Sequence, residues 1–212
     1  IFYMPFDATT GYTELVTFTN STVVGSPGFA AQGVQGSAYA GATDSYLTFP
    51  GTPLQSAEFS AFFWLKVNAV PDRAGVLVMG PPDPANPSAQ NVRTSGFRFF
   101  RENAGGKQRF KLNVGTGAGE SWFYGGPAAD VDPAADEWVS FAFTITATQA
   151  KVYIDGQVVS QNTFAGINWT GCDLLSIMSG APRFTGWDHK SDRSYMDELR
   201  LFNKELSQVE IE

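Results

Sequence analysis

The sequence predicts an all-β domain made of two packed antiparallel sheets. Three observations lead to this prediction. Apolar and polar residues alternate in many short runs, helical periodicity is scarce, and Gly, Pro, Asn and Asp cluster between the runs. The 18 Phe suit half-buried pleated surfaces, and the 22 Gly and 12 Pro suit turns. Ten or more strands of unequal length, joined by long irregular loops, favour a sandwich over a closed barrel.

The predicted strands follow one another along the whole chain. The N-terminal segment IFYMPFD is expected to form a strand in which Pro5 requires an edge position or a strand start. Further strands are predicted at 46–50, 59–67, 75–80, 96–102, 109–115, 121–125, 138–147, 150–159, 174–180 and 196–202. No break in composition divides the 212 residues, so we expect a single domain over residues 1–212.

The connections have sequence signals of their own. Hairpin turns are expected at Gly105-Gly106 and in the 150–159 run at Asp155-Gly156. The Pro-rich stretch 80–93 is predicted to be a long loop. Near the C-terminus, the segment 207–210 has the spacing of a capping box, which can start one helical turn.

Charge and cysteine content exclude several classes of protein. The net charge of −7 argues against nucleic acid or an anionic membrane as the main partner. No apolar run reaches the roughly 18 residues of a membrane span, so membrane insertion is not expected. The single cysteine, Cys172, rules out an internal disulfide and a Cys-rich metal site, and it is expected in the core. The chain starts at Ile1 without Met and reads as a processed segment, so the lack of a signal peptide says little about destination.

Four segments occur in an order that is similar to a known family. They are GVQGSAYAGATDSYLTFPG, FSAFFWLKV, EWVSFAFTITATQAKVYIDGQVV and YMDELRLFNKELSQVEI, and together they extend over nearly the whole chain. This pattern resembles the laminin-G-like domains of the concanavalin A-like lectin/glucanase superfamily. The resemblance implies a jelly-roll sandwich of two curved antiparallel sheets in a secreted or cell-surface protein, usually one part of a larger multidomain chain. The fold carries lectins, lyases, hydrolases and inert spacers, so it does not fix the activity.

Two adjacent acids, Asp197 and Glu198, lie in the last predicted strand. Because neighbouring strand residues point to opposite faces, we expect Asp197 on the face of the core residues Leu199 and Leu201, and Glu198 outside with Arg200. Carboxylates that diverge cannot act on one glycosidic bond. The Glu-x-Asp-x-x-Glu strand of laminarinase-type hydrolases is also absent from the sequence, which disfavours a glycosidase of that type.

The resemblance also implies a structural calcium ion. In similar jelly rolls, an Asp at the position of Asp197 joins an acid of the first strand and backbone carbonyls around the metal. Asp7 is the matching N-terminal acid here, and the segment from Gly36 to Ala38 would supply a carbonyl oxygen. Hard oxygen ligands suit calcium. The alternative is that Asp197 accepts backbone N–H groups and that Asp7 lies in an Asx turn.

A set of aromatic and polar side chains is predicted to point away from the core. The set comprises Trp64, Arg98, Arg109, Lys111, Asn113, Trp122, Tyr124 and Tyr153. If their strands share one concave sheet, aromatic faces can stack on the C–H patches of a sugar while polar groups bind its hydroxyls or carboxylates. A basic cluster on an acidic protein favours an anionic glycan. The alternatives are that Trp64 fills a packing position and the others are ordinary strand residues, or that ligand binds the edge loops, at Arg183, Trp187 and Asp188 beside the loop 80–93.

Three functions remain open on this sequence. The first is a non-catalytic carbohydrate-binding or adhesive module of a secreted or cell-surface protein. The second is a structural or protein-interaction spacer. The third, disfavoured, is a polysaccharide lyase or glycoside hydrolase. A lyase would need a cluster of Tyr, His, Arg and Asn in the groove. Tyr124 or Tyr153 beside Arg98 or Arg109 could start one, but the only histidine, His189, is expected in a surface loop.

Overall fold

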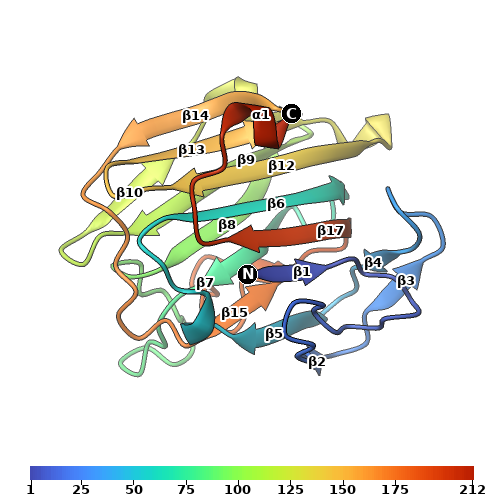
Figure 1. The fold of residues 1–212 in the computed structure, drawn as a ribbon, viewed down its shortest axis with the longest axis horizontal. Helices are drawn as coiled ribbons and strands as arrows, with labels where there is room; N and C mark the ends of the chain where they lie inside the picture. Colours follow the sequence, from blue (N-terminus) through green and yellow to red (C-terminus); the bar gives the residue numbers. More distant parts are fainter.

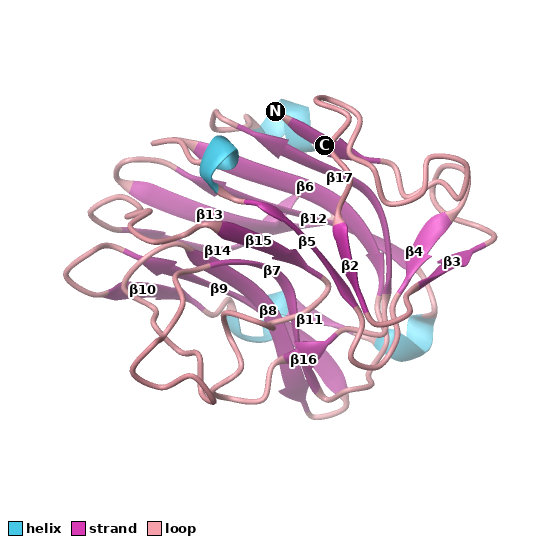
Figure 2. Cartoon of the chain, turned by 90° about the horizontal axis from the view of Figure 1, so that it is seen from below, coloured by secondary structure: helices cyan, strands magenta, loops and turns pink.

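The chain folds into two β-sheets that pack face to face (Figure 1). The structure is a computed structural model that describes all of residues 1–212. Every strand pair is antiparallel except the two-residue pairing of β16 with β7. Figure 2 shows the two sheets as curved layers with the few helical turns at the periphery. The predicted all-β sandwich is therefore confirmed.

The eight-stranded sheet has the order β14-β13-β12-β6-β17-β4-β3, and β1 also pairs with β17. Its strands are β1 (Phe2–Met4), β3 (Gly28–Ala30), β4 (Ala38–Ala40), β6 (Phe59–Lys66), β12 (Trp138–Ile145), β13 (Gln149–Ile154), β14 (Gln157–Thr163) and β17 (Tyr195–Phe202). The final strand β17 therefore lies inside the sheet rather than at its edge.

The nine-stranded sheet has the order β10-β9-β8-β7-β15-β5-β2, with β11 paired to β9 and β16 to β7. Its strands are β2 (Thr22–Val24), β5 (Tyr46–Pro50), β7 (Arg73–Met79), β8 (Phe97–Ala104), β9 (Lys107–Gly115), β10 (Glu120–Phe123), β11 (Asp130–Val131), β15 (Leu174–Ile177) and β16 (Lys190–Ser191). The helical elements are α1 (Gln208–Ile211) and the 3-10 turns η1 (Thr52–Leu54), η2 (Gly126–Ala129) and η3 (Pro133–Ala135).

Phenylalanines from both sheets interlock to form the core between the layers. Phe63 of β6 contacts Phe99 of β8 with ring centroids 5.7 Å apart, and Phe110 of β9 contacts Phe141 of β12 at 4.3 Å. All four are fully buried within a cluster of 34 residues that also contains Cys172, as expected. Replacing one such Phe with Ala lowers the free energy of unfolding by about 3–5 kcal/mol, so these contacts contribute strongly to holding the two sheets together.

Local signals placed the turns correctly. The β8–β9 hairpin closes with Ala104 opposite Lys107, and the β13–β14 hairpin closes with Ile154 opposite Gln157. The C-terminal turn α1 has the predicted capping box between Ser207 and Glu210. The strands β2, β3 and β4 were not predicted, because three residues are too few for an alternating pattern to show.

Strand β17 contains a β-bulge at the two adjacent acids. Asp197 pairs with Trp64 of β6, and the next paired residue, Arg200, lies opposite Phe62. Between these two pairs β17 advances by three residues while β6 advances by two, so β17 has one extra residue. Glu198 has a φ of 53°, in the left-handed region that non-glycine residues seldom adopt.

The bulge overturns the predicted orientation of Asp197. Met196, Leu199 and Leu201 all lie in the core, whereas Asp197 lies opposite Trp64 on the other side of the sheet. The prediction that Asp197 shares the face of the core leucines is therefore wrong. Glu198 does bind Arg200, at 2.5 Å, but it is 4% exposed and so is not a surface residue.

Candidate functional site

The outer face of the nine-stranded sheet gathers several of the predicted binding residues. Arg98 of β8 pairs across the strands with Asn113 of β9, which pairs in turn with Trp122 of β10. Lys111 lies two residues before Asn113 and so shares this face. The structure therefore brings these four residues together on the outer face of one sheet.

Three aromatic rings form a row along this face. The ring of Trp122 is parallel to that of Tyr124, with centroids 5.5 Å apart and an interplanar angle of 4°. It is equally parallel to the ring of Trp187, at 6.1 Å and 4°. Trp187 and Tyr124 are 45% and 50% exposed. We call these three residues the aromatic row.

Two cationic side chains lie against the row. The guanidinium carbon of Arg93 is 4.8 Å from the ring centroid of Trp187 and 5.8 Å from that of Trp122. The ammonium group of Lys111 is 5.3 Å from the ring centroid of Tyr124. Cations at such distances are attracted to the negative ring faces and help to fix the rings in place. Arg93 was missed in the sequence because it belongs to an irregular connection with no periodicity.

Two long loops meet beside the row. The backbone N–H of Thr185 donates to the carbonyl of Gln90 at 3.1 Å, and its hydroxyl donates to the carbonyl of Ala89 at 3.0 Å. Trp187 belongs to the loop 178–189, between β15 and β16, and Arg93 belongs to the loop 80–96, between β7 and β8. The sheet face and the edge loops, which were alternative sites in the sequence, therefore contribute to one surface.

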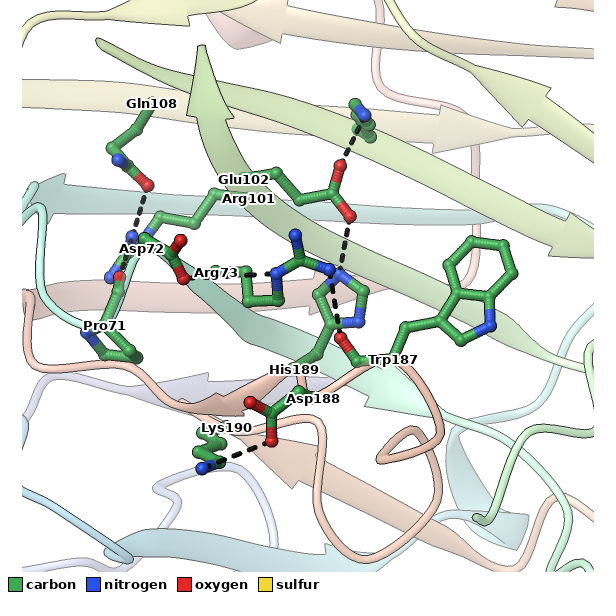
Figure 3. Close-up of polar contacts among 11 residues, drawn as sticks. Pro71, Asp72, Arg73, Arg101, Glu102, Gln108, Trp187, Asp188, His189 and Lys190 are labelled. Carbon is green, nitrogen blue, oxygen red and sulfur yellow. Dashed lines mark hydrogen bonds and ion pairs between the residues drawn. The ribbon is translucent and has the colours of Figure 1, made fainter. Parts of the chain in front are cut away.

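His189 anchors the loop that carries Trp187. Its ring stacks on Phe184 at 4.4 Å, meets the edge of Phe100 at 4.6 Å, and places Nε2 3.0 Å from Oε1 of Glu102. Figure 3 shows the imidazole directed at Glu102 while the indole of Trp187 extends away from it. His189 is fully buried, so the expectation of a surface loop is wrong: the loop folds back onto the sheet.

The two carboxylates on this face, Glu102 and Glu120, are both bound by basic side chains. Glu102 accepts from His189 and, at 2.6 Å, from Lys111, and these contacts hold its pKa at about 2. Glu120 binds Arg93 through both of its oxygens, at 2.7 and 3.1 Å. Burial raises the pKa of Glu120, but the hydrogen bonds from Arg93 and Asn113 outweigh it, and the net shift is downward. Both carboxylates are thus anions at neutral pH.

Two of the predicted basic residues are not free to meet a ligand. Arg98 is fully buried, where it donates to the carbonyl of Val92 and, at 3.4 Å, to Asn113. Its pKa is lowered to about 10 by burial. Arg109 makes a two-pronged ion pair with Asp130, at 2.6 and 2.8 Å.

Trp64 and Tyr153 lie on the other sheet. They belong to β6 and β13, so the expectation that all eight predicted residues share one groove is wrong for these two. Tyr153 is 2% exposed, packed under Leu206 and Ile211 of the C-terminal segment. Alternation defines the faces of a strand but not the sheet to which the strand belongs.

Comparisons with known proteins agree with this architecture. The sequence matches the Laminin_G_3 family, described as the concanavalin A-like lectin/glucanases superfamily, over residues 41–212. The chain belongs to this superfamily. Among curated proteins, no sequence matches this member of the superfamily at a significant level.

Solved structures extend the likeness to most or all of the chain. Domain 4 of a GH43 extracellular arabinanase from Geobacillus stearothermophilus, in complex with arabinotriose, is 18% identical with a TM-score of 0.74, covering 99% of this chain and 95% of that one. The CBM40 of a Ruminococcus gnavus sialidase, bound to sialyllactose, is 14% identical with a TM-score of 0.57, over 81% and 94%. A botulinum neurotoxin binding domain is 11% identical with a TM-score of 0.61, but the match spans only 47% of that chain. At these identities the likeness shows the superfamily's jelly-roll fold.

The residues of the implied calcium site converge on one loop. Asp197 accepts from the backbone N–H of Gln35 at 3.0 Å, and Asp7 accepts from that of Ser37 at 3.0 Å. A side chain at Gly36 would meet Asp7 at 2.0 Å, and Gly36 has a φ of 70°. A side chain at Gly33 would meet Asp197 at 2.5 Å in the same way, so the loop 33–37 needs glycine at both positions to let the two carboxylates approach its backbone.

Both carboxylates accept backbone N–H groups, as in the alternative expectation, and their oxygens are hard donors of the kind that also suit a cation. Asp197 is fully buried and has no cationic partner, and burial raises the pKa of its carboxyl to about 6 despite the hydrogen bonds from Gln35 and Glu198. A buried carboxylate without a counter-charge is costly, and two carboxylates with backbone carbonyls are ligands that calcium prefers. No group of three or more acidic, His or Cys side chains is placed to hold a metal ion here. No helix is long and apolar enough to cross a membrane.

Proposed function

We propose that this domain is a non-catalytic carbohydrate-binding module of a secreted or cell-surface multidomain protein. The observation that carries the proposal is the aromatic row, in which Trp187 and Tyr124 are each about half exposed and both stack on the ring of Trp122. Aromatic rings have large apolar faces that stack on the C–H patches of sugars, and their fixed orientation lowers the entropy lost on binding.

The polar groups around the row supply hydrogen bonds for sugar hydroxyls. Arg93 and Glu120 lie beside the rings and are each only partly covered, with 21% and 26% of their side chains exposed. Such apolar surfaces with a few fixed polar groups are typical of small-ligand sites. The solved neighbours that carry arabinotriose and sialyllactose support glycan binding in general.

The state of the carboxylates supports binding rather than hydrolysis. A glycosidase needs one carboxylic acid that keeps its proton near neutral pH, and it needs a partner carboxylate across the scissile bond. Glu102 and Glu120 both have lowered pKa values and are engaged by His189, Lys111 and Arg93. Neither is suited to donate a proton to a leaving group.

A structural calcium at Asp7, Asp197 and the backbone of Gly36 is part of the proposal. It would neutralise the buried Asp197 and connect the first strand region to β17 through the loop 33–37. The ion would stabilise the fold at a distance from the aromatic row, on the other sheet, and would not contact the glycan.

Affinity electrophoresis tests the proposed function. The domain is run through gels that contain single polysaccharides, neutral or acidic, and retardation without release of reducing ends is the expected result. Trp187→Ala is expected to abolish retardation, because it removes one end of the row. Trp64→Ala, on the opposite sheet, is the matched control and is expected to keep it. No retardation on any polysaccharide would favour the spacer function instead.

A further inference from the structure

We propose that the aromatic row selects neutral glycans and rejects acidic ones, and that the Arg93–Glu120 pair sets this selectivity. The inference rests on the proposed function and names the class of its ligand. It differs from the expectation of an anionic glycan, which depended on a cluster of free basic side chains.

The basic side chains at the row are already neutralised. Arg93 is paired with Glu120 through two hydrogen bonds, at 2.7 and 3.1 Å. Lys111 is paired with Glu102 at 2.6 Å. Arg73, which donates to the carbonyl of Trp187 at 3.2 Å, has the carboxylate of Asp72 at 4.0 Å. Each cation near the rings thus has a carboxylate partner, and the row offers no unpaired cation to an acidic glycan.

The other two arginines of the face, Arg98 and Arg109, are also not free to pair with an acidic sugar. Arg98 has no exposed surface and is covered by the backbone at Val92. Arg109 is held by Asp130 at 2.6 and 2.8 Å. An acidic sugar at the row would therefore lie near the carboxylates of Glu102 and Glu120 and would gain no unpaired cation in return, which disfavours it relative to a neutral sugar. The net charge of −7 acts in the same direction.

The same pair is well suited to uncharged hydroxyls. The guanidinium of Arg93 uses two of its N–H groups on Glu120, and its other N–H groups make no hydrogen bond within the protein. Oε1 of Glu120 accepts one hydrogen bond, from Arg93, so it can accept another from a ligand hydroxyl. Two neighbouring hydroxyls of one sugar can therefore accept from Arg93 and donate to Glu120. The guanidinium carbon lies 4.8 Å from the centroid of the Trp187 ring, so a sugar that packs against the exposed part of this ring brings its hydroxyls close to the pair.

The test compares neutral and acidic polysaccharides at low ionic strength, where charge effects are largest. The neutral probes are a linear arabinan, a mannan and a β-glucan, and the acidic probes are polygalacturonate and alginate. Glu120→Gln removes the carboxylate charge and leaves Arg93 unpaired. Glu137→Gln makes the same change of net charge at an exposed residue without a hydrogen bond, and is the matched control.

We expect the wild type to bind at least one neutral probe and neither acidic one. Glu120→Gln should gain affinity for the acidic probes by about tenfold or more, the usual worth of a charge-assisted hydrogen bond. Glu137→Gln should behave as the wild type. Equal or tighter binding of acidic probes by the wild type would overturn the inference while leaving the proposed function intact. A folded Glu120→Gln variant that still ignores acidic probes would overturn the role of the pair. Failure to bind any probe would reject the proposed function itself.

Discussion

Nε2 of His189 lies 3.0 Å from Oε1 of Glu102, so the loop that carries Trp187 is joined to strand β8 by a buried side-chain contact. A second contact supports the same loop, because Nη1 of Arg73 donates to the carbonyl of Trp187 at 3.2 Å (Figure 3). The half-exposed indole is therefore presented from a backbone that is held at two points, Trp187 and His189.

Replacing His189 with Ala is expected to weaken both the fold and the glycan site. It removes the ring packed between Phe184 and Phe100, at a cost of about 2–4 kcal/mol by analogy with other large buried side chains. Retardation on the best neutral probe should also fall, because Trp187 loses its anchor. Urea unfolding and affinity electrophoresis measure the two effects. Lys190→Ala, which breaks only an exposed pair with Asp188, should change stability by less than about 1 kcal/mol.

Acid should destabilise the wild type more than the Glu102→Gln variant. The pKa of Glu102 is about 2 in the folded protein and 4.5 as its ordinary value, so the unfolded state binds the proton more readily. This contribution to stability is present above pH 4.5 and is lost as the pH falls toward 2, by about 3 kcal/mol at most. Thermal midpoints recorded from pH 5 to pH 2.5 should fall more steeply for the wild type. Parallel curves for the two proteins would contradict the expectation.

Asp192→Asn should be among the most destabilising single changes. Asp192 and Arg101 form a two-pronged pair at 2.8 and 2.9 Å with both side chains fully buried. Removing one charge leaves the other buried without a partner, at a cost of about 3–5 kcal/mol. Asp136→Asn breaks the exposed pair with Lys66 by the same chemical change, and should cost less than about 1 kcal/mol. Denaturant midpoints compare the two variants.

Calcium is expected to raise the melting temperature of metal-stripped protein. Ligand present at about a hundred times its dissociation constant stabilises a folded state by about 2.7 kcal/mol. Asp197→Asn should remove most of this response, because the buried carboxylate is lost. Gel retardation should be little affected, since the site lies on the other sheet. An unchanged midpoint when calcium is added to the stripped wild type would count against the metal.

Much of the fold could be predicted because period-two alternation is a local property. The long strands β6, β8, β9, β12 and β17 each carry enough alternating residues for their faces to be read. Which strands share a sheet depends on long-range pairing, and for this reason Trp64 and Tyr153 were wrongly grouped with Trp122. The bulge at Glu198 was also invisible, because nothing in its neighbouring residues signals a left-handed backbone.

The candidate site could be predicted only in part, because alternation gives information about strand residues but not about loop residues. Strand alternation placed Trp122, Tyr124 and Lys111 correctly on one face. Arg93 lies in an irregular connection, where no pattern shows what a side chain contacts. His189 was assigned to the surface because its segment is polar, yet Phe184 and Phe100 bury its ring.

The central place of β17 has a consequence for biosynthesis. This strand pairs with β6, β4 and β1, so residues 195–202 join segments from the first third of the chain. Until the ribosome has synthesised and released residues 195–202, the edge of β6 that pairs with β17 stays unpaired. Unpaired strand edges promote aggregation. Nascent chains arrested before residue 195 should therefore depend on chaperones, while those that extend past residue 202 and clear the exit tunnel should resist proteases.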